Sequence, residues 1–289
     1  MQAVDGVISE LFPEARVVRL PSHQAMSKSS HYVLKRSDYC FVGGTNILAS
    51  KGWQLHWHDL VYLNRAICLG VTWGGTKATP TYKERLILRR VLDGQHQHSV
   101  RDQYTKKLLD GMNIRSVSTS CPAMWKLTPE HCEAIPKTKS DSVMFTLTGY
   151  RSDLARDRQM IETLQRNYRN LYFFPQMVGD MEYLESLQIG NVKIIPPNLR
   201  AYDEALANTE LDYVGSRLHG GIRALQFKKR TLIIGIDHRS RTISQDTGLP
   251  VLDRVELNRL ESWITNCAPT RIRIPLADIA AWKSQVLTH

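Results

Sequence analysis

The stretch GSRLHGGIRALQF, residues 215–227, places an arginine, a histidine and two glycines between two apolar segments. The residues before it, LDYV at 211–214, are typical of a strand, and the IRALQF segment at its end is typical of a helix. The backbone N–H groups at a helix N-terminus favour binding of an anion. The stretch therefore predicts a strand–helix corner of an α/β sheet, with Arg217 and His219 where such sheets bind ligands.

Strand-like and helix-like runs alternate on both sides of this corner, which is typical of parallel sheets covered by helices. The segments LHWHDLVYLNRA (55–66) and TPTYKERLILRRVLDG (79–94) have helical character, and Asp102 and Gly111 are expected to cap a helix between them. The expected strands before the corner are RVVRL (16–20), DYCFVGG (38–44), ICLGVTWGG (67–75) and HSVRD (98–102). Those of the later half are DSVMFTLTGY (141–150), NLYFFPQM (170–177), NVKIIPP (191–197), LDYV and TLIIGID (231–237).

A Pro- and Lys-rich segment of low hydrophobicity, EAIPKTKSD at 133–141, interrupts the alternation and is interpreted as a linker. The expected organisation is a Rossmann-like domain at 1–135 and a second at 140–272, facing each other across a cleft. The amphipathic segment 277–289 is expected to be a helix that packs back on the first domain. No apolar strand precedes MQAVDGVISELF, so the first domain is expected to open with a helix.

The net charge of +10 and the pI near 9.4 indicate an anionic partner or a solvated basic surface. The basic residues are dispersed and no nucleic-acid-binding motif is present, so no nucleic-acid partner is predicted. Five scattered cysteines without a C-x-x-C pair indicate a reducing compartment. We expect neither a secretory leader nor a membrane span, and therefore a cytoplasmic location. Contact with the inner face of the membrane stays open. The sequence does not predict the oligomeric state.

The ends of the expected strands carry the residues from which a ligand site could be built. Arginine pairs bidentately with phosphate or carboxylate, so three arginines and a histidine at such positions favour a small dianion as ligand. In the first half these positions are Gly43, Gly44, Thr45 and Asn46, then Gly74, Gly75 and Thr76, then Arg101 and Asp102. In the second half they include Arg151, Arg217, Leu218, His219, Gly220 and Arg239.

Each of these residues also has a purely structural interpretation. Arg217 could pair with a carboxylate at the corner, and His219 could be satisfied by the backbone. The glycines at 220 and 221 could serve only close packing of the helix on the sheet. Arg101 could form a surface pair with its neighbour, and Arg239 could be a solvated loop charge. For Arg151 neither interpretation is favoured by the residues alone.

Two H-x-H runs, His56 with His58 and His96 with His98, raise a metal-binding alternative, because residues i and i+2 share one face of a strand. The first run lies in a segment expected to be helical, where such side chains diverge, and no carboxylate ligand is indicated by the spacing. No metal site is predicted. The absence of G-x-S-x-G gives no support to a hydrolase nucleophile elbow.

Four segments together resemble the polysaccharide pyruvyltransferase family. GSRLHGGIRALQF resembles that family's S-x-R-L-H-G signature, and SVRDQYTKKLLDGMNI (99–114) resembles its SVRD segment, with Thr105 where serine is common. FVGGTNIL (41–48) is similar to its glycine-rich turn, with Thr45 in place of a third glycine. IGIDHRSRTISQDTGLPVL (234–252) is similar to its C-terminal motif. The family's first strand and Gly-Asp turn are not evident, which bears on the acceptor site.

The resemblance implies a two-domain fold similar to B-type glycosyltransferases. It also implies transfer of a pyruvyl group from phosphoenolpyruvate to two hydroxyls of a sugar, forming a cyclic ketal, with no metal or nucleotide cofactor. The acceptor would be a lipid-linked or nascent glycan in cell-wall or exopolysaccharide biosynthesis, in a bacterial cytoplasm.

The site residues expected for this reaction come from the strand ends named above. His219 is the expected proton-transfer residue, because imidazole titrates near neutrality. The expected phosphoenolpyruvate-binding residues are Arg217, Leu218, Gly220, Arg151 and Arg239. The expected acceptor-binding residues are Gly43, Gly44, Asn46, Gly74 and Arg101. Two other functions stay open: a nucleotide-sugar glycosyltransferase of the same architecture, and a catalytically silent binding protein.

Overall fold

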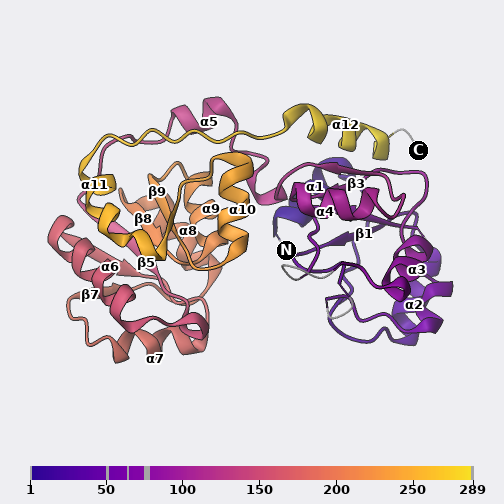
Figure 1. Ribbon diagram of the computed structural model, residues 1–289, viewed down its shortest axis with the longest axis horizontal. Helices are drawn as coiled ribbons and strands as arrows, with labels where there is room; N and C mark the ends of the chain where they lie inside the picture. Colours follow the sequence, from indigo (N-terminus) through magenta and orange to yellow (C-terminus); the bar gives the residue numbers. More distant parts are fainter. Residues whose placement is uncertain (1, 50–51, 64, 75–78, 288–289) are drawn as a thin grey trace. The chain divides into compact units, whose positions relative to one another are not determined.

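The computed structural model describes residues 2–49, 52–63, 65–74 and 79–287 (Figure 1). The chain divides into two compact units, Met1–Trp125 with Ile274–His289, and Lys126–Arg273. The division falls after Trp125, ahead of the boundary expected at 135. The reason is that helix α5 (Pro129–Glu133) belongs to the second unit, where His131 Nε2 lies 2.8 Å from the Leu225 carbonyl oxygen.

The second unit is built on one six-stranded parallel sheet with the strand order β10-β9-β8-β5-β6-β7. This is the doubly wound Rossmann order, in which the chain starts at the centre, builds one half of the sheet, and returns to build the other. The reversal lies between the neighbouring strands β5 and β8. The strands are β5 (Ser142–Thr146), β6 (Asn170–Phe173), β7 (Val192–Ile194), β8 (Asp212–Gly215), β9 (Thr231–Gly235) and β10 (Val251–Asp253).

Alternate residues of these strands face different helices. Val143 and Phe145 of β5 pack in one core cluster with residues of α6 (Leu154–Asn167) and α11 (Leu260–Thr265). Tyr213 and Ile233 lie against α9 (Leu218–Gln226). The contact is so close that a Cβ at Gly221 of this helix would lie 2.4 Å from Ile233 Cγ1. The remaining helical segments are η3 (Gly149–Arg151), α7 (Val178–Ser186), α8 (Leu199–Asn208), α10 (His238–Thr247) and η4 (Arg254–Arg259).

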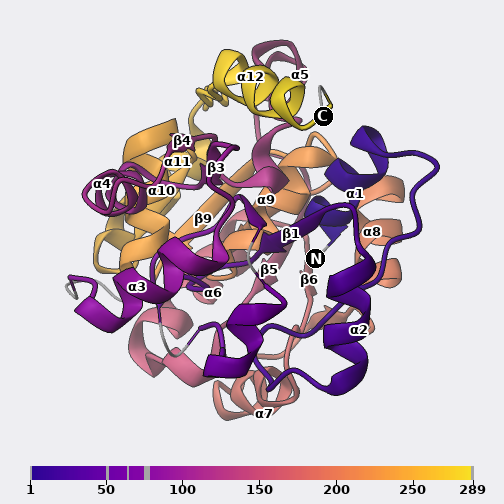
Figure 2. The ribbon, with the colours of Figure 1, turned by 90° about the vertical axis from the view of Figure 1, so that its right-hand side faces the viewer.

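The first unit also has parallel strand pairs, and Figure 2 shows its elements from a second direction. Strand β1 (Cys40–Gly43) pairs with β2 (Ala66–Leu69), and β3 (His98–Val100) pairs with β4 (Ser116–Ser118). A parallel bridge between Val71 and Val100 connects the two pairs. Its helical segments are α1 (Gln2–Leu11), α2 (Lys28–Arg36), η1 (Trp57–Val61), α3 (Tyr82–Val91), α4 (Gln103–Asp110), η2 (Pro122–Met124) and α12 (Leu276–Leu287).

Helix α12 packs on the N-terminal helix α1 within this unit. Trp282 is fully buried in one cluster with Val7, Leu11 and Leu69, and its Nε1–H donates to the Gln97 carbonyl oxygen at 2.9 Å. No helix among the described residues is long and apolar enough to cross a lipid bilayer.

Local details of the first unit both confirm and correct the sequence predictions. Asp102 caps α4 by accepting from the Thr105 N–H at 2.7 Å, and Gly111 is its C-cap, as predicted. The prediction of a strand at 16–20 is wrong. This segment is irregular, and Val17 and Val18 are exposed. Of the described residues in the segment 55–66, those from Trp57 to Val61 form the short η1 helix, and β2 begins at Ala66.

Gly215, at the end of β8, sets how closely the two central strands approach. A Cβ at this position would lie 2.3 Å from Thr146 Oγ1 and 2.6 Å from the Thr146 backbone nitrogen. Gly215→Ala should therefore lower the free energy of unfolding by at least about 2 kcal/mol, because strand backbone cannot move aside as a side chain can. Equilibrium urea denaturation measures the loss.

Gly190→Ala is the matched control in the same unit, because a Cβ there would meet nothing within 4 Å. Its unfolding free energy should stay within about 0.5 kcal/mol of that of the unchanged chain or rise slightly. Equal stability of the two variants would show that the β5–β8 approach does not require glycine.

Candidate active site

Hydrogen bonds join the carboxyl ends of β5 and β8, the point where the strand order reverses. Thr146 Oγ1 lies 2.6 Å from the Tyr213 hydroxyl, and Thr148 Oγ1 lies 2.8 Å from Ser216 Oγ. The Arg217 N–H donates to Thr146 Oγ1 at 3.3 Å. These side chains are buried or half-buried, so the strand–helix corner is fixed by its own polar network.

Arg217 faces inward at this corner. Its Nε–H donates to the Leu147 carbonyl oxygen at 2.9 Å, and Nη2 lies 2.6 Å from both carboxylate oxygens of Asp180. The Arg217 side chain is 11% exposed and that of Asp180 is 2% exposed. The predicted open anion clamp therefore needs correction, because the positive charge of Arg217 is already neutralised by a carboxylate, which is the structural interpretation that the sequence left open.

Asp180 also gathers backbone donors from two strand-end loops. It accepts from the Gly149 N–H at 3.1 Å, after β5, and from the Gln176 and Met177 N–H groups at 3.0 Å, after β6. With Arg217 after β8, the carboxylate ties together the ends of three neighbouring strands. Sequence analysis did not identify Asp180, although its position three residues after Met177, in the first turn of α7, is typical of a helix-capping acid.

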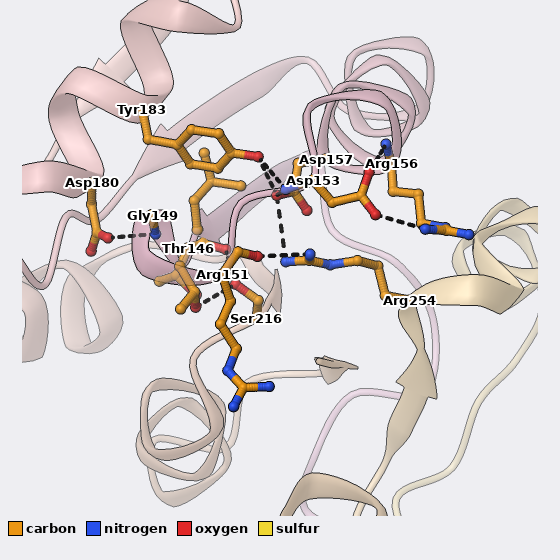
Figure 3. Close-up of polar contacts among 12 residues, drawn as sticks. Thr146, Gly149, Arg151, Asp153, Arg156, Asp157, Asp180, Tyr183, Ser216 and Arg254 are labelled. Carbon is orange, nitrogen blue, oxygen red and sulfur yellow. Dashed lines mark hydrogen bonds and ion pairs between the residues drawn. The ribbon is translucent and has the colours of Figure 1, made fainter. Parts of the chain in front are cut away.

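A hydrogen bond from Arg254 fixes the backbone of the turn that carries Arg151 (Figure 3). The Arg254 Nη1–H donates to the Arg151 carbonyl oxygen at 2.8 Å, and Arg254 Nη2 lies 3.5 Å from Asp157 Oδ2. The Tyr183 hydroxyl donates to the same Asp157 oxygen at 2.6 Å. Burial raises the pKa of Asp157, against the lowering effects of Tyr183 and Arg254.

The Arg151 guanidinium itself points away from this network in Figure 3 and is exposed. It forms no ion pair within the part of the chain that the structure describes. Arg151 is therefore a cation on a turn whose backbone is fixed at Gly149 and at its own carbonyl. The positive charge of the Arg151 side chain is therefore accessible to a ligand.

Arg239 lies on the first turn of α10, at the end of β9. Its Nε and Nη2 lie 2.9 and 2.6 Å from Asp237 Oδ2, and its side chain is 39% exposed. The second Asp237 oxygen caps the helix by accepting from the Ser240 N–H at 3.2 Å. Arg239 is thus oriented by its neighbour, and its guanidinium is partly exposed.

His219 is exposed on the first turn of α9, and Leu218 before it is half-buried. The residue at the N-cap of this helix, Arg217, makes no side-chain capping bond, so no side chain of the N-cap occupies the first-turn N–H groups. Gly220 and Gly221 serve close packing, because a Cβ at Gly220 would lie 2.8 Å from the Tyr213 hydroxyl oxygen.

The predicted acceptor residues meet at one edge of the first unit. The Arg101 Nη1–H donates to Thr45 Oγ1 at 2.7 Å, and the Asn46 N–H donates to Thr72 Oγ1 at 2.7 Å. A Cβ at Gly74 would lie 3.1 Å from the Asn46 carbonyl oxygen. Gly43 ends β1, and Gly44 and Asn46 have positive φ angles of 138° and 60°. Gly75 and Thr76 lie outside the described residues.

The second H-x-H run does not form a ligand pair. His98 is buried in β3, where its Nδ1 accepts from the Cys68 N–H at 3.2 Å and its Nε2 lies 3.0 Å from the Asp93 carbonyl oxygen. Burial lowers the pKa of His98 to about 4. His96 instead lies 2.9 Å from the Asp93 carboxylate. His98 is therefore a core hydrogen-bonding residue.

The doubly wound parallel sheet of the second unit and the parallel strand pairs of the first place the chain in the Rossmann-like α/β class, consistent with a fold of the glycosyltransferase-B type. The sequence profile of the polysaccharide pyruvyl transferase family matches residues 1–238, so the chain belongs to this family of transferases, as the sequence motifs predict. No curated protein matches the chain.

A solved structure described as an S. aureus MnaA–UDP co-structure is similar to this chain, with a TM-score of 0.50 and 12% sequence identity. The match covers 100% of this chain and 87% of the other. At this level of identity the likeness shows the fold alone.

The Arg217–Asp180 pair generates a stability prediction. Asp180→Ala should lower the free energy of unfolding by about 3–5 kcal/mol, because it leaves a buried guanidinium unpaired and removes the acceptor of three backbone N–H groups. Urea denaturation followed by circular dichroism measures the change. Asp203→Ala is the matched control, since Asp203 pairs with Arg223 in the same unit but both side chains are about a third exposed.

The control should cost about 1 kcal/mol or less. Equal losses in the two variants would contradict the role of Asp180 as the buried junction of the three loops.

Proposed function

We propose that the protein transfers a pyruvyl group from phosphoenolpyruvate to two hydroxyls of one sugar in a cell-wall or exopolysaccharide precursor, forming a cyclic ketal. Family membership supports pyruvyl transfer in general. The observation that carries the donor is the exposed, unpaired Arg151 guanidinium at the carboxyl end of β5, beside the switch point of the sheet.

Phosphoenolpyruvate offers a phosphate and a carboxylate, and guanidinium groups bind both in bidentate fashion. In the proposed complex Arg151 and Arg239 bind these two anionic groups, together with the N–H groups of the first turn of α9 near Gly220. Arg217 acts as a positioning residue, because its guanidinium already forms an ion pair with Asp180. Its contacts to Leu147 and Asp180 hold the loops that carry the other donor ligands.

The reaction balances without an oxidant or a metal. A proton is added to the methylene carbon of phosphoenolpyruvate, which leaves a cationic centre on the neighbouring carbon. The first sugar hydroxyl adds there and releases its proton. The bond from this carbon to the phosphate oxygen then breaks, and the second hydroxyl adds to close the ketal. The two hydroxyls lose two protons in total. This number equals the one proton added to the methylene carbon, which becomes the methyl group, plus the one taken up by the released phosphate.

His219 is the proposed proton-transfer residue. Its imidazole is exposed on the first turn of α9, and histidine is the side chain that most often transfers protons in enzymes. Arginines cannot directly stabilise the cationic centre, so their proposed contribution is orientation of the donor and stabilisation of the charge on the leaving phosphate.

The proposed acceptor surface is the edge of the first unit that carries Gly43, Gly44, Asn46, Gly74 and Arg101. Arg101 is fixed there by the Gly70 carbonyl oxygen at 2.5 Å and by Thr45, so it is a preorganised donor for sugar hydroxyls. A lipid-linked or nascent glycan is the proposed acceptor, which agrees with the basic net charge of +10 for work beside an anionic membrane surface.

Donor binding is tested by calorimetric titration with phosphoenolpyruvate and, separately, with UDP and UDP-sugars. Arg151→Ala should weaken phosphoenolpyruvate binding about 10- to 100-fold, the loss expected for one charge-assisted contact. Arg200→Ala is the control, because Arg200 is an exposed arginine on α8 paired with Glu204. Binding of UDP-sugars in place of phosphoenolpyruvate would instead favour the glycosyltransferase alternative.

Catalysis is tested by phosphate release from phosphoenolpyruvate in the presence of a panel of methyl glycosides with neighbouring or 4,6-paired hydroxyls. His219→Ala should reduce turnover by about 10²- to 10⁴-fold while phosphoenolpyruvate still binds, because only proton transfer is removed. Turnover at the unchanged rate in His219→Ala would exclude His219 as the proton-transfer residue.

A further inference from the structure

Two histidines and an aspartate, none of them among the residues proposed to bind the acceptor, converge in the first unit. His31 lies on α2, and His58 and Asp59 lie on η1. His31 Nε2 is 2.6 Å from Asp59 Oδ1, and His58 Nε2 is 3.5 Å from the same oxygen. One ligand atom from each of the three residues lies within 4.8 Å of the other two.

The charge of Asp59 requires compensation. Its side chain is fully buried, and within the described residues its ion-pair partners are the two histidines alone. Burying a carboxylate is costly unless its charge is compensated. A bound divalent cation would neutralise the carboxylate and would be coordinated by one ring nitrogen of each histidine.

Neighbouring groups hold the three side chains in place. The second oxygen of Asp59 accepts from the His56 N–H at 2.8 Å, which leaves Oδ1 directed at the histidines. Tyr62 stacks on the His31 ring at 4.4 Å between centroids, and the His56 ring lies parallel to that of His58 at 5.5 Å. A hydrogen bond to the second oxygen of a ligating carboxylate is typical of metal sites.

We propose that His31 Nε2, His58 Nε2 and Asp59 Oδ1 bind one divalent transition-metal ion of the zinc class. A tetrahedral zinc ion with bonds of about 2.0–2.1 Å separates its ligand atoms by about 3.3 Å. The His58–Asp59 distance of 3.5 Å already matches this value, and the His31–Asp59 pair at 2.6 Å opens slightly on binding. His58 is 48% exposed, so the ion reaches the site from solvent, and water completes its coordination.

This ion has a structural role in the proposal. It joins α2 to η1, between which the chain forms the single described strand β1. The sequence alternative of a metal at His56 and His58 paired the wrong residues. His56 stands at the N-cap of η1 and contributes its backbone N–H, while the second imidazole comes from His31, far away in the sequence.

The test is calorimetric titration of the full, tag-free chain with zinc chloride after dialysis against EDTA, with cobalt chloride as a spectroscopic probe. One ion should bind per chain, and Co²⁺ should give the visible absorption bands of a four-coordinate site. His58→Ala and Asp59→Asn should each weaken binding by more than about 100-fold, beyond the typical effect of losing a supporting residue.

His23→Ala is the matched control, because His23 is an exposed histidine of the same unit outside the cluster, and it should bind zinc like the unchanged chain. Zinc should raise the melting temperature of the unchanged chain and of this control, and should not raise that of His58→Ala. Absence of one-to-one binding by the unchanged chain overturns the proposal whether or not a variant folds. Equal binding by His58→Ala or Asp59→Asn also overturns it. The test does not depend on pyruvyl transfer.

Discussion

The ion pair between Arg217 and Asp180 is the contact on which the candidate active site depends. The guanidinium bonds to a carbonyl after β5 and to the carboxylate, and the carboxylate accepts N–H groups from the loops after β5 and β6. Burying two charges is costly unless each is hydrogen-bonded on several sides, and both meet this condition here. Three strand ends are thereby fixed to one another at the point where the strand order reverses.

This arrangement separates the residues that build the site from those available to a ligand. Arg217, in the most recognisable motif of the chain, is committed to the protein itself. Arg151, whose turn is fixed by Arg254, is exposed and forms no ion pair within the described residues, and Arg239, paired with Asp237, is partly exposed. In the proposed donor complex these cations would lose little freedom on binding a dianion, because their positions are already fixed.

The alternation from β5 to β9, the corner at Gly215 and the cap at Asp102 follow from local patterns, and the structure has them where the sequence predicts them, whereas α2, β4 and β10 were not predicted. Long-range partners were not predictable in the same way. Nothing near Arg217 in the sequence indicates Asp180, because the pairing depends on the order of strands in the sheet. The same holds for His31 and Asp59, and RVVRL shows that an apolar run without a neighbouring strand stays irregular.

The placement of α12 has a consequence for biosynthesis. The first unit contains residues on both sides of the second unit in the sequence, and Trp282 is part of its core. On the ribosome, the whole second unit emerges before α12, although domains usually fold in the order in which they are made. The apolar side of α1 therefore stays without its covering helix until the whole second unit has been synthesised, so apolar surface of the nascent first unit is exposed during that interval.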